Sequence, residues 1–284
     1  MPDSSGVEIR LLRESDIAAA MELKRFAGWN QTESDWRTLL QLEPNGCFAA
    51  VLDVQLVGTT TTTTYGNELA WIGMVLVRPD RRRAGIATKL LQNALSYLEG
   101  KVAAVKLDAT EVGKPVYERF GFEVESLIER WSRKGKLISF ERQPETIAPE
   151  TRREILQLDC RAFGANRSKL LDMLLANSCV RPVITKNDDG SVTGYALARS
   201  GSDAVYVGPI VSGEGSHALE SLDQLLEQVQ SSRVYVDFNC NWGEGAELLR
   251  ERGFEKQRDL LRMQRGPASP TSPLVFAIAG PEIG

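Results

Sequence analysis

Apolar and polar positions in the first half of the chain follow two periods, which predict a mixed sheet with helices packed on it. Alternation with a period of two marks strands, and apolar residues three or four positions apart mark helices. The strongest helical stripe runs from Ile86 to Leu98, and Gly100 ends that helix. The predicted strands cover residues 7–13, 47–53, 56–65, 68–77, 102–109 and 122–131, and the predicted helices cover residues 15–27, 32–44, 83–99 and 113–119.

The second half of the chain repeats much of this plan. Two local matches support an internal duplication: WIGMV at residues 71–75 aligns with YVGPI at 206–210, and YERFGFE at 117–123 aligns with LRERGFE at 249–255. The predicted helices of this half cover residues 150–163, 167–176, 217–229 and 245–252, and its predicted strands cover residues 180–186, 192–199, 204–211, 234–238 and 254–263.

The repeat predicts two tandem α/β domains, each with a mixed sheet (α+β) covered by helices. Residues 134–149 combine Gly, Pro and mixed charges, so the boundary is placed there, between domains of residues 1–135 and 136–284. Residues 274–279 form an apolar run of strand length after three prolines, and we expect this run to dock as an added strand.

Composition and charge narrow the classes of function. Hydrophobic residues make up 42% of the chain, charged residues 25%, and the net charge is -4, which gives no support to a nucleic-acid or membrane-surface partner. No apolar run approaches the roughly 20 residues of a membrane helix. The first residues lack the basic start and apolar middle of a signal peptide, and the four cysteines are widely scattered. These features predict a cytoplasmic protein with reduced thiols.

The chain has a single histidine, His217, which excludes zinc sites built on several histidines. A Ser-His-Asp or Cys-His arrangement could be centred only on this residue, and no nucleophile motif such as G-x-S-x-G surrounds it. We therefore interpret His217 as an exposed or helix-entry residue and expect no bound metal.

The segment VLVRPDRRRAGIAT at residues 75–88 has the pattern of an anion-binding turn, because a strand ends, a basic turn follows and a helix begins on small residues. The first N–H groups of a helix have no internal partners and lie at the positive end of its dipole, so a pyrophosphate can bind there. Gly85 and Ala87 keep the approach open, and Arg82 and Arg83 add positive charge. Neither G-x-x-x-x-G-K-[ST] nor G-x-G-x-x-G is present, so ATP and dinucleotide folds are not supported.

The motif Arg82-x-x-Gly85-x-Ala87 after a V-x-V strand resembles the acetyl-CoA signature Q/R-x-x-G-x-G/A of the GNAT N-acetyltransferases. The resemblance covers residues 7–132 with the order of elements intact. It implies a tandem GNAT-like fold that uses acetyl-CoA as cosubstrate. The strand backbone would pair with the pantetheine arm, and amides at the helix start would hold the pyrophosphate. The competing interpretation is a basic turn that opens a core helix. The cofactor-binding residues that the resemblance implies are Val75, Leu76, Val77, Arg82, Arg83, Ala84, Gly85, Ile86, Ala87 and Thr88.

Tyr117 is the catalytic residue that the resemblance implies. It matches the position at which many GNAT enzymes carry a tyrosine near the CoA sulfur. A phenol with a pKa of about 10 can protonate the departing thiolate. The alternative is a half-buried tyrosine that packs on the short helix.

The general base is the weakest part of the resemblance. Many relatives place a glutamate on the strand before the V-x-V segment, and that position falls near Trp71, which cannot accept a proton. Glu68 is the nearest carboxylate in sequence, and we interpret it as an exposed strand-end charge. The departure leaves room for a water relay.

Trp29 and Asn30 are predicted to bind substrate. They lie between the first two helices, where GNAT domains line the acceptor pocket, and an indole beside amides in a loop suggests recognition of a polar or aromatic molecule. A hydrophobic staple that fixes the second helix explains Trp29 equally well. The sequence GWNQ at residues 28–31, together with LDAT at 107–110 and GKP at 113–115, resembles a bacterial subgroup of tandem GNAT proteins.

The second half lacks the anion-binding turn. Its counterpart is the shorter segment SGEGS at residues 212–216, in which Glu214 would repel a pyrophosphate, and Leu249 stands where Tyr117 stands in the first half. We therefore expect a structural or substrate-shaping domain whose strands complete the acceptor pocket.

The function predicted from these residues is direct, acetyl-CoA-dependent N-acetylation of a primary amine. The acceptor is a small molecule or a peptide, and the protein is a monomer or a homodimer. The alternative from another class is a non-catalytic acyl-CoA-binding sensor or interaction module, which the missing strand glutamate favours. Transfer of a longer acyl group is a third possibility.

Overall fold

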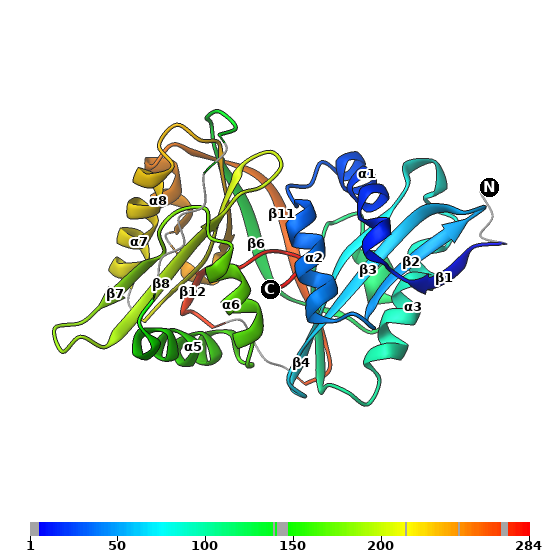
Figure 1. Cartoon of the computed structure of the whole chain (residues 1–284), viewed down its shortest axis with the longest axis horizontal. Coiled ribbons are helices and arrows are strands. Elements are labelled where there is room, and N and C mark those ends of the chain that lie inside the picture. Colours follow the sequence, from blue (N-terminus) through cyan, green and yellow to red (C-terminus); the bar gives the residue numbers. More distant parts are fainter. Residues whose placement is uncertain (1–5, 139, 141–146, 214, 244, 268–271) are drawn as a thin grey trace.

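The computed structural model describes residues 6–138, 140, 147–213, 215–243, 245–267 and 272–284, and within them it shows one continuous mixed sheet (Figure 1). The strand order is β1-β2-β3-β4-β5-β11-β6-β10-β12-β9-β8-β7. The predicted α/β class is thereby confirmed. The strands are β1 (Glu8–Leu11), β2 (Cys47–Leu52), β3 (Gln55–Tyr65), β4 (Leu69–Val77), β5 (Ala104–Ala109), β6 (Glu123–Arg133), β7 (Val183–Lys186), β8 (Val192–Arg199), β9 (Val205–Ser212), β10 (Val234–Asn239), β11 (Phe254–Arg265) and β12 (Val275–Ala277).

The helices begin and end where local signals place them. Thr32 caps the second helix in a capping box, in which the Asp35 carboxylate accepts from the Thr32 N–H at 2.6 Å. The first helix ends at Gly28, whose φ of 65° suits a residue without Cβ. The helices are α1 (Ile17–Ala27), α2 (Glu33–Leu42), α3 (Ile86–Leu98), α4 (Lys114–Glu118), α5 (Pro149–Phe163), α6 (Ser168–Ala176), α7 (Gly215–Gln228) and α8 (Gly245–Glu251).

The two halves exchange one strand each at the centre of the sheet. β6 closes the first half in sequence, yet it pairs antiparallel with β10 of the second half. β11 lies between β5 and β6 and pairs antiparallel with both. Figure 1 shows these two long strands crossing between the lobes. Since each half contains a strand from the other, the predicted boundary near residue 135 divides the sequence but not the sheet.

Each exchanged strand is held by a buried Arg–Asp pair. Arg130 on β6 donates two hydrogen bonds to Asp237 on β10, at 2.7 and 2.6 Å. Arg262 on β11 donates two hydrogen bonds to Asp108 on β5, both at 2.9 Å. Breaking one such pair by removing a single partner leaves a buried charge without compensation, which typically costs 3–5 kcal/mol.

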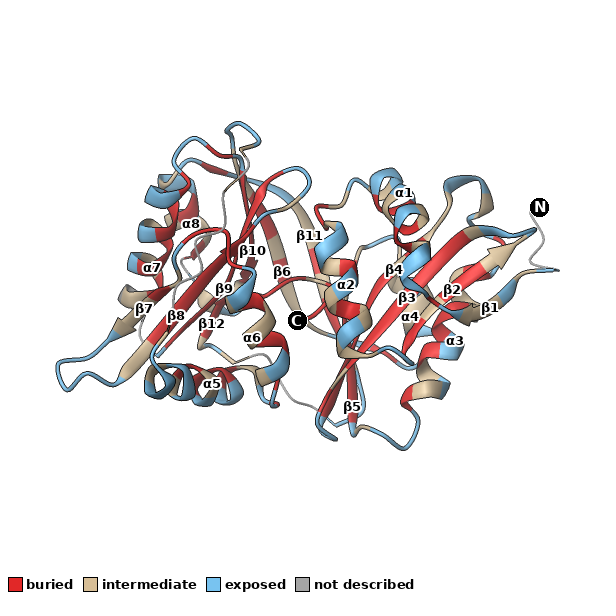
Figure 2. Cartoon of the chain, in the orientation of Figure 1, coloured by how far each residue is buried: buried red, intermediate tan, exposed pale blue. Residues whose placement is uncertain are grey.

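Helices cover both faces of the sheet, and buried residues concentrate along the strands between them (Figure 2). On one face, α1 and α2 of the first half and α5 and α6 of the second half pack into a single hydrophobic cluster, together with buried residues of the last segment of the chain. On the other face, α3 packs over the N-terminal strands and α7 and α8 over the C-terminal strands. Helices of both halves therefore pack into one cluster on the first face, whereas on the other face the helices of each half belong to separate clusters.

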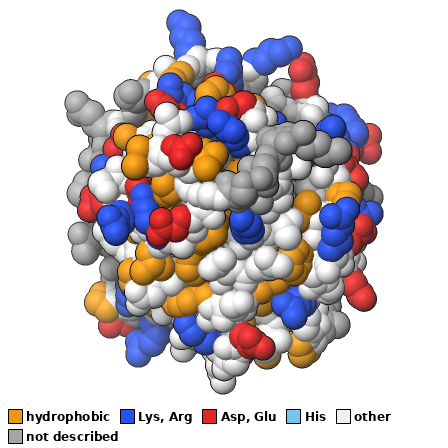
Figure 3. All heavy atoms as spheres, turned by 90° about the vertical axis from the view of Figure 1, so that its right-hand side faces the viewer, with side chains coloured by type: hydrophobic (Ala, Val, Ile, Leu, Met, Phe, Trp, Pro, Cys, Tyr) orange, Lys and Arg blue, Asp and Glu red, His pale blue; other side chains and the backbone are white. Residues whose placement is uncertain are grey.

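On the face of the N-terminal half that Figure 3 shows, charged side chains of both signs are interspersed rather than gathered in a basic stripe. Among the described residues, no helix is long and apolar enough to cross a membrane. No group of three or more His, Cys, Asp or Glu side chains in this part of the chain could hold a metal ion.

Candidate acetyl-CoA site

β4 and β5 pair in parallel at their first residues and then diverge. Their registered pairs are Leu69 with Ala104, Ala70 with Val105, and Trp71 with Lys106. Beyond Trp71, the described residues of β4 have no strand partner on the β5 side. On this side of the resulting wedge, Val75 and Val77 have no strand among the described residues to pair with, which is the arrangement that a pantetheine arm would need to pair like a neighbouring strand.

A β-bulge bends β4 at the mouth of this wedge. Two residues, Met74 and Val75, lie opposite the single residue Thr60 of β3, and Met74 has a φ of 50°. The Thr59 hydroxyl donates to the Met74 carbonyl at 2.8 Å, so the threonine-rich strand supports the bulge. The strand predicted to bind the cofactor thus has a β-bulge next to the wedge between β4 and β5.

The turn between β4 and α3 has the backbone of an anion site. Gly85 is the N-cap of α3 with a φ of 79°, and Arg83 also has a positive φ of 63°. Residues that alternate between negative and positive φ turn their N–H groups toward one concavity. Gly85, Arg82 and Arg83 are exposed, and the Arg82 Nε donates to the Val77 carbonyl at 3.2 Å.

The other residues predicted to bind the cofactor lie around the Gly85 turn. Ala84 and Ile86 are buried and anchor the turn, whereas Ala87 and Thr88 are half-buried at the first helical turn. Gly58 of β3 lets α3 approach the sheet closely, since a Cβ there would lie 3.0 Å from the Leu90 side chain and 3.2 Å from the Ile86 side chain of α3. The chain therefore fits a pyrophosphate at this helix end, although direct contact with acetyl-CoA stays a prediction.

Tyr117 lies on α4 and packs against a hydrophobic cluster that includes Ile72 of β4 and Leu107 of β5. Its half-buried ring packs edge-to-face on Phe122, with ring centroids 6.1 Å apart. Burial raises the pKa of the Tyr117 hydroxyl to about 12, so the phenol keeps its proton at neutral pH. The packing supports a structural role, and the retained proton equally supports the predicted role as an acid.

The Asn30 side chain forms hydrogen bonds that link the two halves. Its carboxamide oxygen accepts from the N–H groups of Asp203 and Ala204, both at 2.9 Å, and its Nδ2 donates to the Ala204 carbonyl at 2.9 Å. Trp29 is half-buried against the shared hydrophobic cluster. These contacts give both residues a structural role, and binding of substrate by either stays a prediction.

Trp71, near the position where the resemblance implies a glutamate, is a buried ring with contacts on two sides. Its Nε1 donates to the Pro281 carbonyl at 2.9 Å, and the Arg262 guanidinium lies 4.6 Å from the ring centroid. Burial raises the pKa of Asp108, the partner of Arg262. Glu68 is exposed before β4, as expected. The roles of Arg262 and Pro281 were missed from sequence because both lie roughly 190–210 residues away along the chain.

The second half contains the same divergence of parallel strands, but its wedge is filled. β9 and β10 pair in parallel only at Val205, Tyr206 and Val207. Beyond these pairs, β12 inserts between the two strands, with Val275 and Ala277 registered on β9 and Ala277 also on Phe238 of β10. The expectation that the last apolar run docks as a strand is confirmed. Glu214, expected to repel a pyrophosphate here, lies outside the described residues.

Comparisons with known proteins decide the family. A model of the Acetyltransferase (GNAT) family matches residues 17–122, and a model of the Acetyltransferase (GNAT) domain matches residues 155–274. The chain belongs to the GNAT acetyltransferases. Both halves are GNAT domains, which confirms the tandem arrangement inferred from the internal repeat.

Relatives of similar length support this assignment. The chain is 25% identical to an uncharacterized N-acetyltransferase, YitH, of Bacillus subtilis, over 88% of each chain. It is 22% identical to the holothin acyltransferase of a Pseudoalteromonas species, over 84% of this chain and 81% of that one. In fold, it resembles the crystal structure of a putative acetyltransferase from Pyrococcus horikoshii, with a TM-score of 0.78, 21% identity and coverage of 98% and 96%.

Proposed function

We propose that this GNAT protein transfers the acetyl group of acetyl-CoA to a primary amine at the wedge of its N-terminal half. The observation that carries the proposal is the open wedge between β4 and β5, which ends at the exposed Gly85 turn at the start of α3. The C-terminal half offers no such space, because β12 lies in it.

Each part of the site has a separate task in this proposal. The thioester supplies an activated acetyl group, and the backbone of Val75 to Val77 aligns the cofactor arm along the strand edge. The turn with Arg82, Arg83 and Gly85 holds the pyrophosphate against the start of α3. Tyr117, which keeps its proton at neutral pH, protonates the departing thiolate.

The acceptor, the oligomeric state and the cellular setting belong to the same proposal. The acceptor is a small-molecule or peptide amine, and the protein acts as a monomer or homodimer without nucleic-acid or membrane partners. Cys47, Cys160, Cys179 and Cys240 are all free, which supports action in the reducing cytoplasm.

A non-catalytic acyl-CoA sensor is the second candidate, because Trp71 stands where relatives carry a glutamate. The two candidates separate in an assay of CoA thiol release on a panel of primary amines, with the N-acetylated product identified by mass spectrometry. Release of CoA thiol in an amount equal to the N-acetylated product would support the enzyme, provided that Gly85→Glu abolishes it. Acetyl-CoA binding without release on any amine would support the sensor, and absence of binding would contradict both.

A further inference from the structure

A cavity of about 320 Å³ lies between the two halves, on the face of the sheet that they share. α2 forms one wall and α6 the opposite wall, and residues Glu282 and Ile283 of the last segment form the floor. Hydrophobic side chains line much of it, among them Leu39, Phe140 and Leu174. The cavity therefore offers an apolar space that neither half could enclose alone.

Three charged side chains face this cavity and form one network. Arg199 donates to Glu282 at 2.8 Å through Nη2 and to Asp35 at 3.2 Å through Nε. Asp35 also accepts from Thr32 in the capping box and interacts with the charge of the buried Lys24. Glu282 and Arg199 are at most 9% exposed, so the Glu282 carboxylate is the buried acceptor that a protonated amine would meet in this cavity.

A buried acceptor without a partner adjoins the network. The Nε2 of Gln31 donates to Glu282 at 2.7 Å, whereas its Oε1 is buried and accepts from no described residue. Exchanging the two amide atoms would set oxygen against the carboxylate, so this orientation is the favoured one. Gln31 is 7% exposed, and an unsatisfied polar atom at such depth costs about 1–3 kcal/mol. The missing partner is therefore a hydrogen-bond donor.

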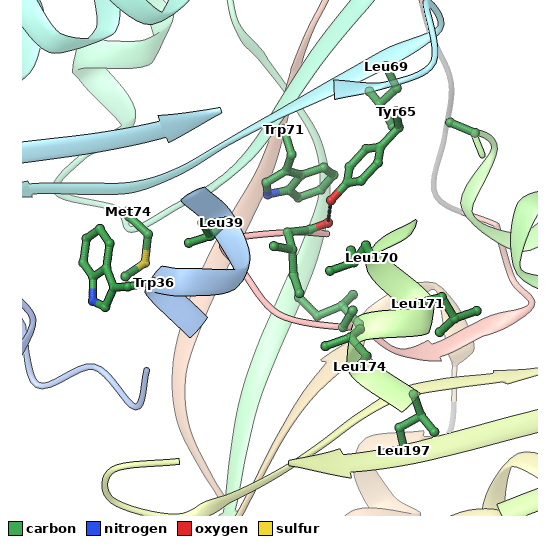
Figure 4. Packing of buried hydrophobic residues seen from close by; sticks show 14 of the residues in the cluster. Trp36, Leu39, Tyr65, Leu69, Trp71, Met74, Leu170, Leu171, Leu174 and Leu197 are labelled. Atoms are coloured by element: carbon green, nitrogen blue, oxygen red, sulfur yellow. Dashed lines mark hydrogen bonds between the residues drawn. The ribbon is translucent and has the colours of Figure 1, made fainter. Parts of the chain in front are cut away.

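The floor of the cavity touches the bulged strand of the acetyl-CoA site. A Cβ on Gly73 would lie 2.5 Å from the Glu282 carbonyl oxygen, so the backbone of Glu282 rests directly on β4 beside the Met74 bulge. Hydrogen bonds to Pro281 from Trp71 and to Ile283 from Tyr65 fix the segment in this place. Figure 4 shows Tyr65, Trp71, Leu39 and Met74 around the same region.

We propose that this cavity binds the acceptor as a protonated amine with an apolar body, and that Glu282 takes the proton from its nitrogen. The inference rests on the proposed function and supplies the base that β4 lacks. The segment that carries Glu282 follows β12, so the half whose wedge is filled would contribute a catalytic residue to the half whose wedge is open.

The protons balance in this scheme. The ammonium nitrogen loses two protons as its bond to the acetyl carbon forms and the carbon–sulfur bond breaks. One proton goes to the Glu282 carboxylate and then to solvent, and the other replaces the proton that Tyr117 gives to the sulfur. Burial raises the pKa of the Glu282 carboxyl, which makes the carboxylate a better proton acceptor than an exposed one.

Binding of simple amines tests the cavity without requiring turnover. Phenethylamine, tyramine and hexylamine are each titrated by calorimetry into the full chain with CoA present, beside the alcohol that lacks the amino group. We expect at least one amine to bind about 10-fold or more tightly than its alcohol, and Glu282→Gln to remove that preference. Glu255→Gln, at a surface glutamate paired with Lys134, is the matched control and should change nothing.

A pH profile tests the proton transfer on whichever amine the thiol-release assay identifies. Glu282→Gln should lower kcat about 100-fold and remove the rise of kcat/KM through the pKa of Glu282, while acetyl-CoA affinity stays unchanged. Arg199 and Asp35 are the charged groups nearest Glu282, and Arg130, Tyr65 and Tyr206 also interact with its charge. Glu282→Asp should restore part of the rate, which a purely structural role would not predict.

Different results would overturn the role of the cavity and the proposed function. If no amine binds better than its alcohol, or if Glu282→Gln keeps the preference and the pH profile, the cavity inference is overturned while acetyl-CoA turnover stands. If the chain does not bind acetyl-CoA, the proposed function itself fails.

Discussion

The two halves contain the same wedge between parallel strands, and they differ in what occupies it. In the N-terminal half the wedge between β4 and β5 is open and leads to the exposed turn at Gly85. In the C-terminal half β12 pairs with β9 and β10 inside the wedge. A strand of the chain satisfies backbone groups there that a cofactor arm would satisfy in the other half.

An Arg–Asp pair lies beside each wedge. Arg262 binds Asp108 beside Trp71, and Arg130 binds Asp237 beside Tyr206, whose hydroxyl donates to Asp237 at 3.0 Å. The duplication has therefore kept the pairs that hold the exchanged strands, although the second wedge is filled. The half that we propose to bind acetyl-CoA therefore differs from the other half at the turn and the wedge, and at Tyr117, where the second half has Leu249.

The largest expected effect comes from placing a carboxylate at the open turn. Gly85→Glu should weaken acetyl-CoA binding about 1,000-fold, or ~4 kcal/mol, because the new charge opposes the pyrophosphate and the φ of 79° disfavours a side chain. Gly213→Glu, at the corresponding turn of the filled half, should leave affinity within about twofold. Calorimetry on both variants makes the comparison, and equal losses would show that the halves do not differ as described.

Removing the side chain that anchors the filling strand should destabilise the fold without creating a second site. Phe276 is fully buried, with edge-to-face contacts to Phe238 at 5.3 Å and Trp242 at 4.9 Å. Phe276→Ala should lower the free energy of unfolding by about 3–4 kcal/mol, measured in urea, whereas Phe26→Ala at an exposed position should change it by about 0.5 kcal/mol or less. Uptake of a second acetyl-CoA by Phe276→Ala would mean that β12 merely blocks an otherwise intact site.

Much of this arrangement can be predicted from the sequence because it is local. Period-two and helical patterns give the elements, Thr32 and Asp35 give a helix start, and the Arg82 to Ala87 turn gives the candidate cofactor site. The exchange of β6 and β11 cannot be predicted in this way. Each strand has the same pattern whichever neighbour it pairs with, so pairing is decided by tertiary contacts such as the two Arg–Asp pairs.

The network that we propose to bind the acceptor could not be predicted for a related reason. Gln31, Asp35, Arg199 and Glu282 form one hydrogen-bonded network, yet they are separated by up to about 250 residues in the chain. No spacing motif connects them. The replacement of the strand glutamate by Trp71 was visible in the sequence, but the carboxylate that lies nearby instead was not.

Substitution of the predicted acid should affect chemistry rather than binding. Tyr117→Phe should reduce kcat about 100-fold at unchanged acetyl-CoA affinity, because the phenol proton is lost while the ring and its contact with Phe122 remain. Tyr235→Phe, which removes a hydroxyl that binds Asp203 in the supporting half, is the control and should leave kcat unchanged. An unaltered rate in Tyr117→Phe would leave this residue with its packing role alone.

The smallest expected effect concerns the carboxylate that is nearest in sequence. Glu68 is exposed, and Glu68→Gln should keep turnover within about twofold at every pH between 6 and 9, since surface substitutions rarely matter. Steady-state rates of CoA release provide the measurement. A tenfold loss would identify Glu68 as the base and contradict the role proposed for Glu282.

The number of acetyl-CoA molecules bound per chain tests the central claim most directly. Calorimetric titration of the full chain should give one molecule per chain, bound at the open wedge of the N-terminal half. Two molecules per chain, or one that remains bound in Gly85→Glu, would contradict the account, because the C-terminal half would then bind cofactor despite β12.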